Sequence, residues 1–157
     1  MAKDTTNVFI SHIHEDDEGL KKLKDLLSEN GMAIRDYSVN KDNPNNAKSE
    51  SYIKSEILTP RIEKSSVLIV YITPDTKESD YVNWEIEHAH TKDKRIVGVW
   101  AWGEKGCDLP QALDKYYDAI VGWIGNDIID AIDGKLDGYE APDGTPRGSR
   151  PIKRHKC

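Results

Sequence analysis

Short apolar runs alternate along the chain with segments in which apolar residues recur at helical spacing. Five of these runs are rich in β-branched residues and predict strands. They cover residues 7–11, 33–37, 67–72, 95–100 and 119–121. The run at 67–72, Val-Leu-Ile-Val-Tyr-Ile, is the most apolar stretch of the chain.

Helices are predicted between these strands, over residues 16–30, over 52–58, through Glu85 and over about 127–132. The first has four leucines at helical spacing and acids in its first turn, and Gly31 follows as a stop signal. After the second, Thr59 resembles a fresh N-cap with Pro60 in the first turn, so a break or kink is expected there. The fourth ends at Gly134.

Alternating strands and helices predict parallel pairing with right-handed crossovers and helices on both faces of the sheet. We therefore expect an α/β fold, a flavodoxin-like doubly wound sheet of five parallel strands in a single domain over residues 1–134. Residues 135–157 are expected to form a polar, basic and flexible extension. In this topology a ligand binds beyond the carboxyl ends of the strands, at the switch point between the first and third strands.

Charge and composition narrow the class of protein. The net charge of −6 includes five positive charges within residues 147–157, so the rest of the 157-residue chain carries −11. An acidic body repels nucleic acid, which argues against a DNA- or RNA-binding domain. The longest apolar run is too short to cross a membrane and residues 1–7 lack a signal-peptide core, so no membrane association and a cytoplasmic location are expected. Cys107 and Cys157 fit neither a disulfide framework nor a metal site.

The helix through Glu85 contains the most informative acid of the chain. At about 100° per residue, Glu85 falls on the seam between an apolar stripe and an aromatic arc. The stripe consists of Val82, Ile86 and Ala89, and the arc of Tyr81, Trp84 and His88. A carboxylate there is pressed against low-polarity surface and suits chemistry on a flat, cationic ligand. The alternative is an amphipathic helix whose acid merely faces solvent.

Several common site types lack support in the sequence. The turn at residues 11–16 contains no glycine, so neither a dinucleotide fingerprint nor a phosphate loop is present. A phospho-receiver would need a lysine after the fifth strand, where the sequence is Gly-Trp-Ile-Gly. His12 and His14 have no third ligand at suitable spacing, so no metal site is predicted. No nucleophile elbow or Cys-His pair supports acyl transfer.

Three segments resemble the Toll/interleukin-1 receptor (TIR) family, in particular the bacterial TIR-like branch of the Thoeris defence ThsB type. They are the first-strand run 8–12, Val-Phe-Ile-Ser-His, the third-strand block 65–73, and the pattern Ser79-x-Tyr81-x-x-x-Glu85. The resemblance covers about residues 5–134. This chain departs from the family pattern in two places. Tyr81 and Val82 replace the usual tryptophan and cysteine, and residues 38–51 do not match the receptor-type adaptor loop.

The resemblance implies an enzyme that cleaves the nicotinamide–ribose bond of NAD, with Glu85 as the catalytic residue. NAD is then the substrate, and no cofactor or metal is implied. A cyclic ADP-ribose-type signal would reach a separate effector protein, and a homo-oligomer is left open. From position at the switch point and from the resemblance, the candidate substrate-binding residues are Phe9, Ser11, His12, Asp36, Tyr37, Tyr81 and Trp84.

Two alternatives use the same fold. A non-catalytic TIR interaction module would carry Glu85 as a surface acid. A nucleoside deoxyribosyltransferase-like enzyme would use a glutamate on a flavodoxin-like sheet to attack the sugar of a free nucleoside.

Overall fold

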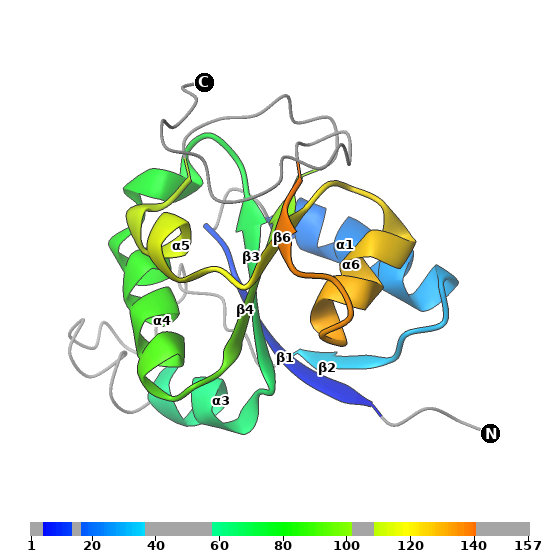
Figure 1. Cartoon of the computed structure of the whole chain (residues 1–157), viewed down its shortest axis with the longest axis horizontal. Coiled ribbons are helices and arrows are strands. Elements are labelled where there is room, and N and C mark those ends of the chain that lie inside the picture. Colours follow the sequence, from blue (N-terminus) through cyan, green and yellow to red (C-terminus); the bar gives the residue numbers. More distant parts are fainter. Residues whose placement is uncertain (1–4, 14–16, 37–57, 102–108, 141–157) are drawn as a thin grey trace.

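A parallel sheet carries helices on both of its faces (Figure 1). The computed structural model describes residues 5–13, 17–36, 58–101 and 109–140. Within them the strands are β1 (Thr6–Ser11), β2 (Ile34–Asp36), β3 (Val67–Ile72), β4 (Arg95–Trp100), β5 (Ala119–Val121) and β6 (Gly138–Tyr139), in the order β2-β1-β3-β4-β5-β6. Every neighbouring pair is parallel. The flavodoxin-like order is thus confirmed, with its switch point between β1 and β3.

The predicted number of five strands is wrong, because the sheet has a sixth strand, β6, beyond residue 134. The Gly138 amide donates to the Asp118 carbonyl and the Glu140 amide to the Ile120 carbonyl, at 3.2 and 2.7 Å. The indole Nε1 of Trp100 also donates to the Glu140 carbonyl at 2.9 Å. Two residues, one of them glycine, form too short a run to indicate a strand, so this element depends on the neighbouring strand for its backbone partners.

The helices agree with the predicted alternation and add one unpredicted helix. They are α1 (Asp17–Glu29), α3 (Thr59–Lys64), α4 (Asp80–Thr91), α5 (Gln111–Tyr116) and α6 (Gly125–Ile132), with a short 3-10 turn, η4 (Thr76–Glu78), before α4. α3 has the predicted proline in its first turn, but its N-cap is Leu58 rather than the predicted Thr59, which is the first residue of the helix. α5 was not predicted. The expected helix at 52–58 lies mostly outside the described residues, because only Leu58 belongs to them.

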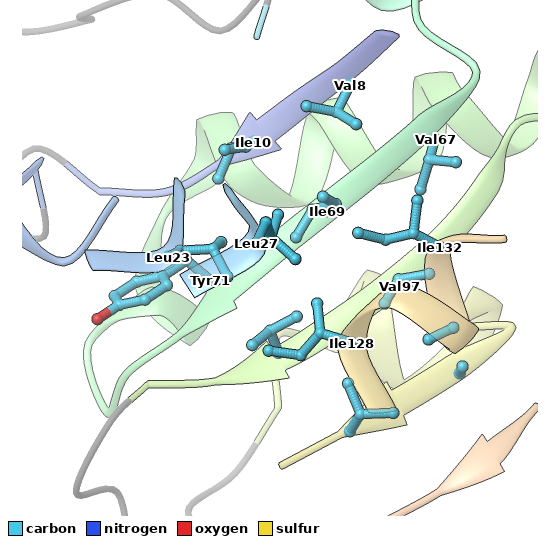
Figure 2. Close-up of a cluster of buried hydrophobic side chains, with 14 of the residues drawn as sticks. Val8, Ile10, Leu23, Leu27, Val67, Ile69, Tyr71, Val97, Ile128 and Ile132 are labelled. Atoms are coloured by element: carbon cyan, nitrogen blue, oxygen red, sulfur yellow. The ribbon is translucent and has the colours of Figure 1, made fainter. Parts of the chain in front are cut away.

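Two apolar cores fill the space between the sheet and its helices. One lies under α1 and α6, where Val8, Ile10, Leu23, Leu27, Ile69 and Ile128 meet (Figure 2). The other lies under α3, α4 and α5 and includes Phe9, Leu68, Ile86 and Trp100. Successive residues of β1 and β3 point alternately into the two cores, as the period of two in a strand requires. All six residues of β3 are buried, because both faces of this central strand are covered.

Candidate active site

The switch point is formed by the end of β1 and the segment that leads from β3 into α4. Thr76 holds that segment: its hydroxyl accepts from the Thr73 amide at 2.9 Å and donates to the Tyr71 carbonyl at 3.2 Å. The Ser79 side chain then caps α4 by accepting from the Val82 amide at 3.2 Å. The start of α4 is therefore fixed to the carboxyl end of β3.

Glu85 lies in the second turn of α4 and is fully buried. Ser11, the last residue of β1, is also fully buried, and its hydroxyl donates to Oε1 of Glu85 at 2.6 Å. Strand alternation explains the meeting, since Ser11 follows Phe9 by two residues and Phe9 packs into the core under α4. The acid predicted on the seam of this helix thus points into the protein toward the sheet, and the solvent-facing alternative is wrong.

The Ser11–Glu85 contact has the features of a strong hydrogen bond. A hydroxyl–carboxylate distance of 2.5–2.7 Å is typical when the acceptor is ionised. Burying a carboxylate costs free energy, and one or two hydrogen bonds do not recover the whole cost. Buried acids of this kind are concentrated in functional sites, where a fixed negative charge stabilises a developing positive one.

The aromatic arc of α4 is also present. Trp84 and His88, one turn apart, stack with ring centroids 5.0 Å apart and an angle of 10° between planes. Tyr81 and Trp84 are half-buried and pack against the core under α4. Burial lowers the pKa of His88, as does Lys92, whereas Glu63 at 4.0 Å from Nε2 opposes the shift. The lowered pKa favours the neutral form of the His88 ring, which stacks on Trp84.

The other predicted substrate-binding residues lie at or near the first two strands. His12 is buried directly after β1, with Nδ1 2.9 Å from the Ile10 carbonyl oxygen. Phe9 is a core residue beneath Ser11. Asp36 pairs in register with Val8 and forms an ion pair with Lys24 of α1 at 2.8 Å, so it faces the side of the sheet opposite Glu85. Tyr37 lies outside the described residues. The structure therefore brings Ser11 to Glu85 but not Asp36, and the substrate-binding roles of these residues stay predictions.

A cavity of about 490 Å³ lies at the opposite edge of the sheet and does not include Glu85. It is lined by the ends of α4 and α5 and the beginnings of β4 and β5, including His90, Lys94, Lys115 and Tyr116. The rings of His90 and Tyr116 stack in this region with centroids 3.9 Å apart. This cavity is therefore not the ligand site that was expected at the carboxyl ends of β1 and β3.

Among the described residues, no three His, Cys, Asp or Glu side chains are grouped so that they could hold a metal ion. In the same ranges, no helix combines the length and apolar character that crossing a bilayer requires.

Sequence reasoning missed two polar residues that organise this edge of the sheet. Asn83 of α4 accepts from the Ala112 amide at 2.9 Å and donates to the Ser79 carbonyl at 3.0 Å, which joins the starts of α5 and α4. Glu140 follows β6 and accepts from the Gly122 amide at 3.1 Å. Neither residue belongs to a motif, and both act through contacts between distant segments.

Comparison with known proteins identifies the family. The family described as "Thoeris protein ThsB, TIR-like domain" matches residues 9–106, which is more than half of the chain. No curated protein sequence matches. The TIR domain of the Toll-related receptor TRR-2 from Hydra magnipapillata is similar in structure, with a TM-score of 0.51 and 19% identity over 82% of this chain and 93% of that one.

Two further solved structures are less similar. One is a Clostridium botulinum CMP N-glycosidase, BcmB, with a TM-score of 0.43 and 18% identity over 60% of this chain and 71% of that one. The other is a conserved protein from Enterococcus faecalis V583, with a TM-score of 0.48 and 12% identity over 85% of this chain and 100% of that one. From the family match and the TIR-like sheet, the chain belongs to the Thoeris ThsB family of TIR-like domains.

Proposed function

We propose that this protein cleaves the nicotinamide–ribose bond of NAD and that Glu85 is its catalytic residue. The observation that carries the proposal is the buried Glu85 carboxylate at the β1–β3 switch point, where doubly wound sheets bind their ligands. Membership of the ThsB family supports a role in Thoeris antiviral defence.

Cleavage of the nicotinamide–ribose bond requires a negative charge near the sugar rather than a strong acid. The bond between the ribose C1′ and the pyridinium nitrogen breaks with its electron pair going to the nitrogen, so nicotinamide leaves as a neutral molecule. The ribose is left with oxocarbenium-like positive charge. A carboxylate held near the sugar stabilises this charge and accepts hydrogen bonds from ribose hydroxyls, as carboxylates do in glycoside hydrolysis. Glu85 fills this role.

The fate of the sugar cation defines the product. Capture by water gives ADP-ribose, whereas capture by another nucleophilic group of the same nucleotide gives a cyclic product. We propose the cyclic ADP-ribose-type product, acting as a diffusible signal for a separate effector protein. Tyr81 and Trp84, which flank Glu85 on α4, are the proposed aromatic contacts for the substrate.

The test is nicotinamide release from NAD by the purified protein, compared with its Glu85→Gln and Glu87→Gln variants. Glu87 lies on the same helix but is exposed, so Glu87→Gln makes the same chemical change outside the site. We expect the first variant to lose activity by at least 100-fold, the scale typical of removing a key electrostatic group, and the second to retain it. Equal activity in all three proteins would refute the assignment.

Infection is the condition in which a defence enzyme acts, so the same assay should include extracts of phage-infected cells. Mass spectrometry of small molecules from such cells, with wild type or Glu85→Gln, identifies the product. Incubation with deoxynucleosides separates the transferase alternative, which predicts base exchange. If neither nicotinamide release nor a Glu85-dependent metabolite occurs in infected cells, the interaction-module alternative replaces the proposal.

A further inference from the structure

The Ser11 hydroxyl is directed at a protein carboxylate rather than at open space. Position at the switch point and the TIR resemblance suggested Ser11 as a substrate-binding residue. Its single proton is instead directed to Oε1 of Glu85, with a donor–acceptor distance of 2.6 Å. While that bond exists, Ser11 cannot also donate a proton to a substrate.

Both partners are held by rigid elements. Ser11 is paired in register with Val70 of the central strand β3. Glu85 lies between Val82 and Ile86, which are fully buried against the sheet, and the helix start is capped by Ser79. Ser11 and Glu85 are both fully buried, and a hydrogen bond is electrostatically stronger in such an environment than in water. The bond therefore contributes to holding the Glu85 carboxyl group in place.

We infer that Ser11 is a positioning residue: its hydroxyl holds Oε1 of Glu85 so that the carboxylate meets the ribose in one defined orientation. This inference rests on the proposed function of Glu85. Preorganised charge is effective because the site does not have to rearrange as the transition state forms. The opposite role would be a latch, in which the hydrogen bond holds Glu85 away from the substrate and must break before turnover.

The test compares Ser11→Ala with Ser65→Ala. Ser65 is a second buried serine, at the opposite edge of the sheet, whose hydroxyl donates to the Arg61 carbonyl at 2.9 Å. Both variants lose one serine hydroxyl and its hydrogen bond, but only the first changes a partner of Glu85. Thermal melting of both variants shows whether the fold is retained.

A positioning role predicts that kcat for NAD cleavage falls about 10- to 100-fold in Ser11→Ala, the scale of one hydrogen bond to a charged group. KM should change less than about threefold, since the substrate contacts remain. The acid side of the pH–rate profile should also move to higher pH, because the ionised carboxylate loses a donor. Ser65→Ala should match the wild type in all three. Wild-type or increased kcat in Ser11→Ala would overturn the inference, and an increase would establish the latch.

A second measurement does not need turnover. Carbon-13 NMR follows titration of the Glu85 carboxyl group, identified as the signal absent from Glu85→Gln. In Ser11→Ala this signal should titrate at higher pH than in the wild type, because the ionised carboxylate loses a donor, and in Ser65→Ala it should not move. An unshifted titration in Ser11→Ala refutes the inference even if NAD cleavage is established. A shifted titration in a protein that never cleaves NAD refutes the proposed function but retains the Ser11–Glu85 coupling.

Discussion

Replacing Glu140 with glutamine should change how the stability of the protein depends on pH. Burial raises the pKa of the Glu140 carboxyl group from 4.5 to about 6; the hydrogen bond from the Gly122 amide opposes this shift, and the neighbouring Asp127 adds to it. The folded state therefore binds this proton more tightly than the unfolded chain does. Stability from this source is fully present below about pH 4.5 and is lost as the pH rises through about 6.

The size of the effect follows from the same two values. A tenfold difference in proton affinity is worth about 1.4 kcal/mol, so a pKa raised from 4.5 to about 6 corresponds to about 2 kcal/mol. Between about pH 4 and about pH 8, the wild type should lose about 2 kcal/mol of unfolding free energy relative to Glu140→Gln. Glutamine retains an oxygen that can accept from the Gly122 amide but carries no charge, so the variant lacks this pH-dependent component.

The assay is urea denaturation of both proteins at several pH values in that range. The exposed Glu87→Gln variant serves as the control, since it removes a carboxylate in solvent and should follow the wild-type pH profile. The difference in unfolding free energy between wild type and Glu140→Gln should change most steeply between the two pKa values, 4.5 and about 6. Parallel profiles for the two proteins would refute the account of Glu140 as a carboxyl group destabilised by burial.

Three further changes test the packing. Gly19→Ala should destabilise the protein by about 1–3 kcal/mol in chemical denaturation, because a Cβ at Gly19 would overlap the Tyr71 hydroxyl; a gain of up to about 1 kcal/mol would show that helix propensity decides instead. Arg95→Met should lower the unfolding free energy by about 2 kcal/mol, because it removes hydrogen bonds to two backbone carbonyls and a carboxylate; an unchanged midpoint would contradict this. A chain ending at residue 134 should be less stable by about 3 kcal/mol or more than one ending at 140, because it lacks β6 and the acceptor for Trp100; equal melting temperatures would show that β6 contributes little.

The strands that the sequence predicted well are those whose signal is local. β3, β4 and β5 have the predicted bounds, because each is a short run rich in apolar and β-branched residues. α5 and β6 were missed because they are short: six residues after Pro110 do not establish a helical period, and a two-residue strand has none. Both elements depend on partners elsewhere in the chain. The Asn83 side chain fixes the start of α5, and β5 supplies the backbone partners of β6.

The candidate site likewise contains residues that the sequence placed correctly and residues that it did not. Helical periodicity placed Glu85 beside the apolar stripe of α4, and the resemblance to TIR enzymes, through the pattern Ser79-x-Tyr81-x-x-x-Glu85, then selected it from the many acids of the chain. The orientation of Asp36 depended instead on the register of β2 against β1, which pairs it with Val8 rather than with the end of β1. Register is determined by packing of whole elements, and the sequence of β2 contains only three residues from which to infer it.

The role of Ser11 could be inferred only from tertiary packing. Its position at the end of β1 was predicted, but the direction of its hydroxyl depends on how α4 lies across the sheet, a contact between residues 74 positions apart. A serine at a switch point faces either a ligand or the protein, and the sequence does not distinguish these cases. Once α4 is placed, the period of two in β1 puts Ser11 on the same face as Phe9 and therefore against Glu85. Local periodicity and the family resemblance thus identified the acid, whereas its hydrogen-bond donor followed only from the packing of α4 on the sheet.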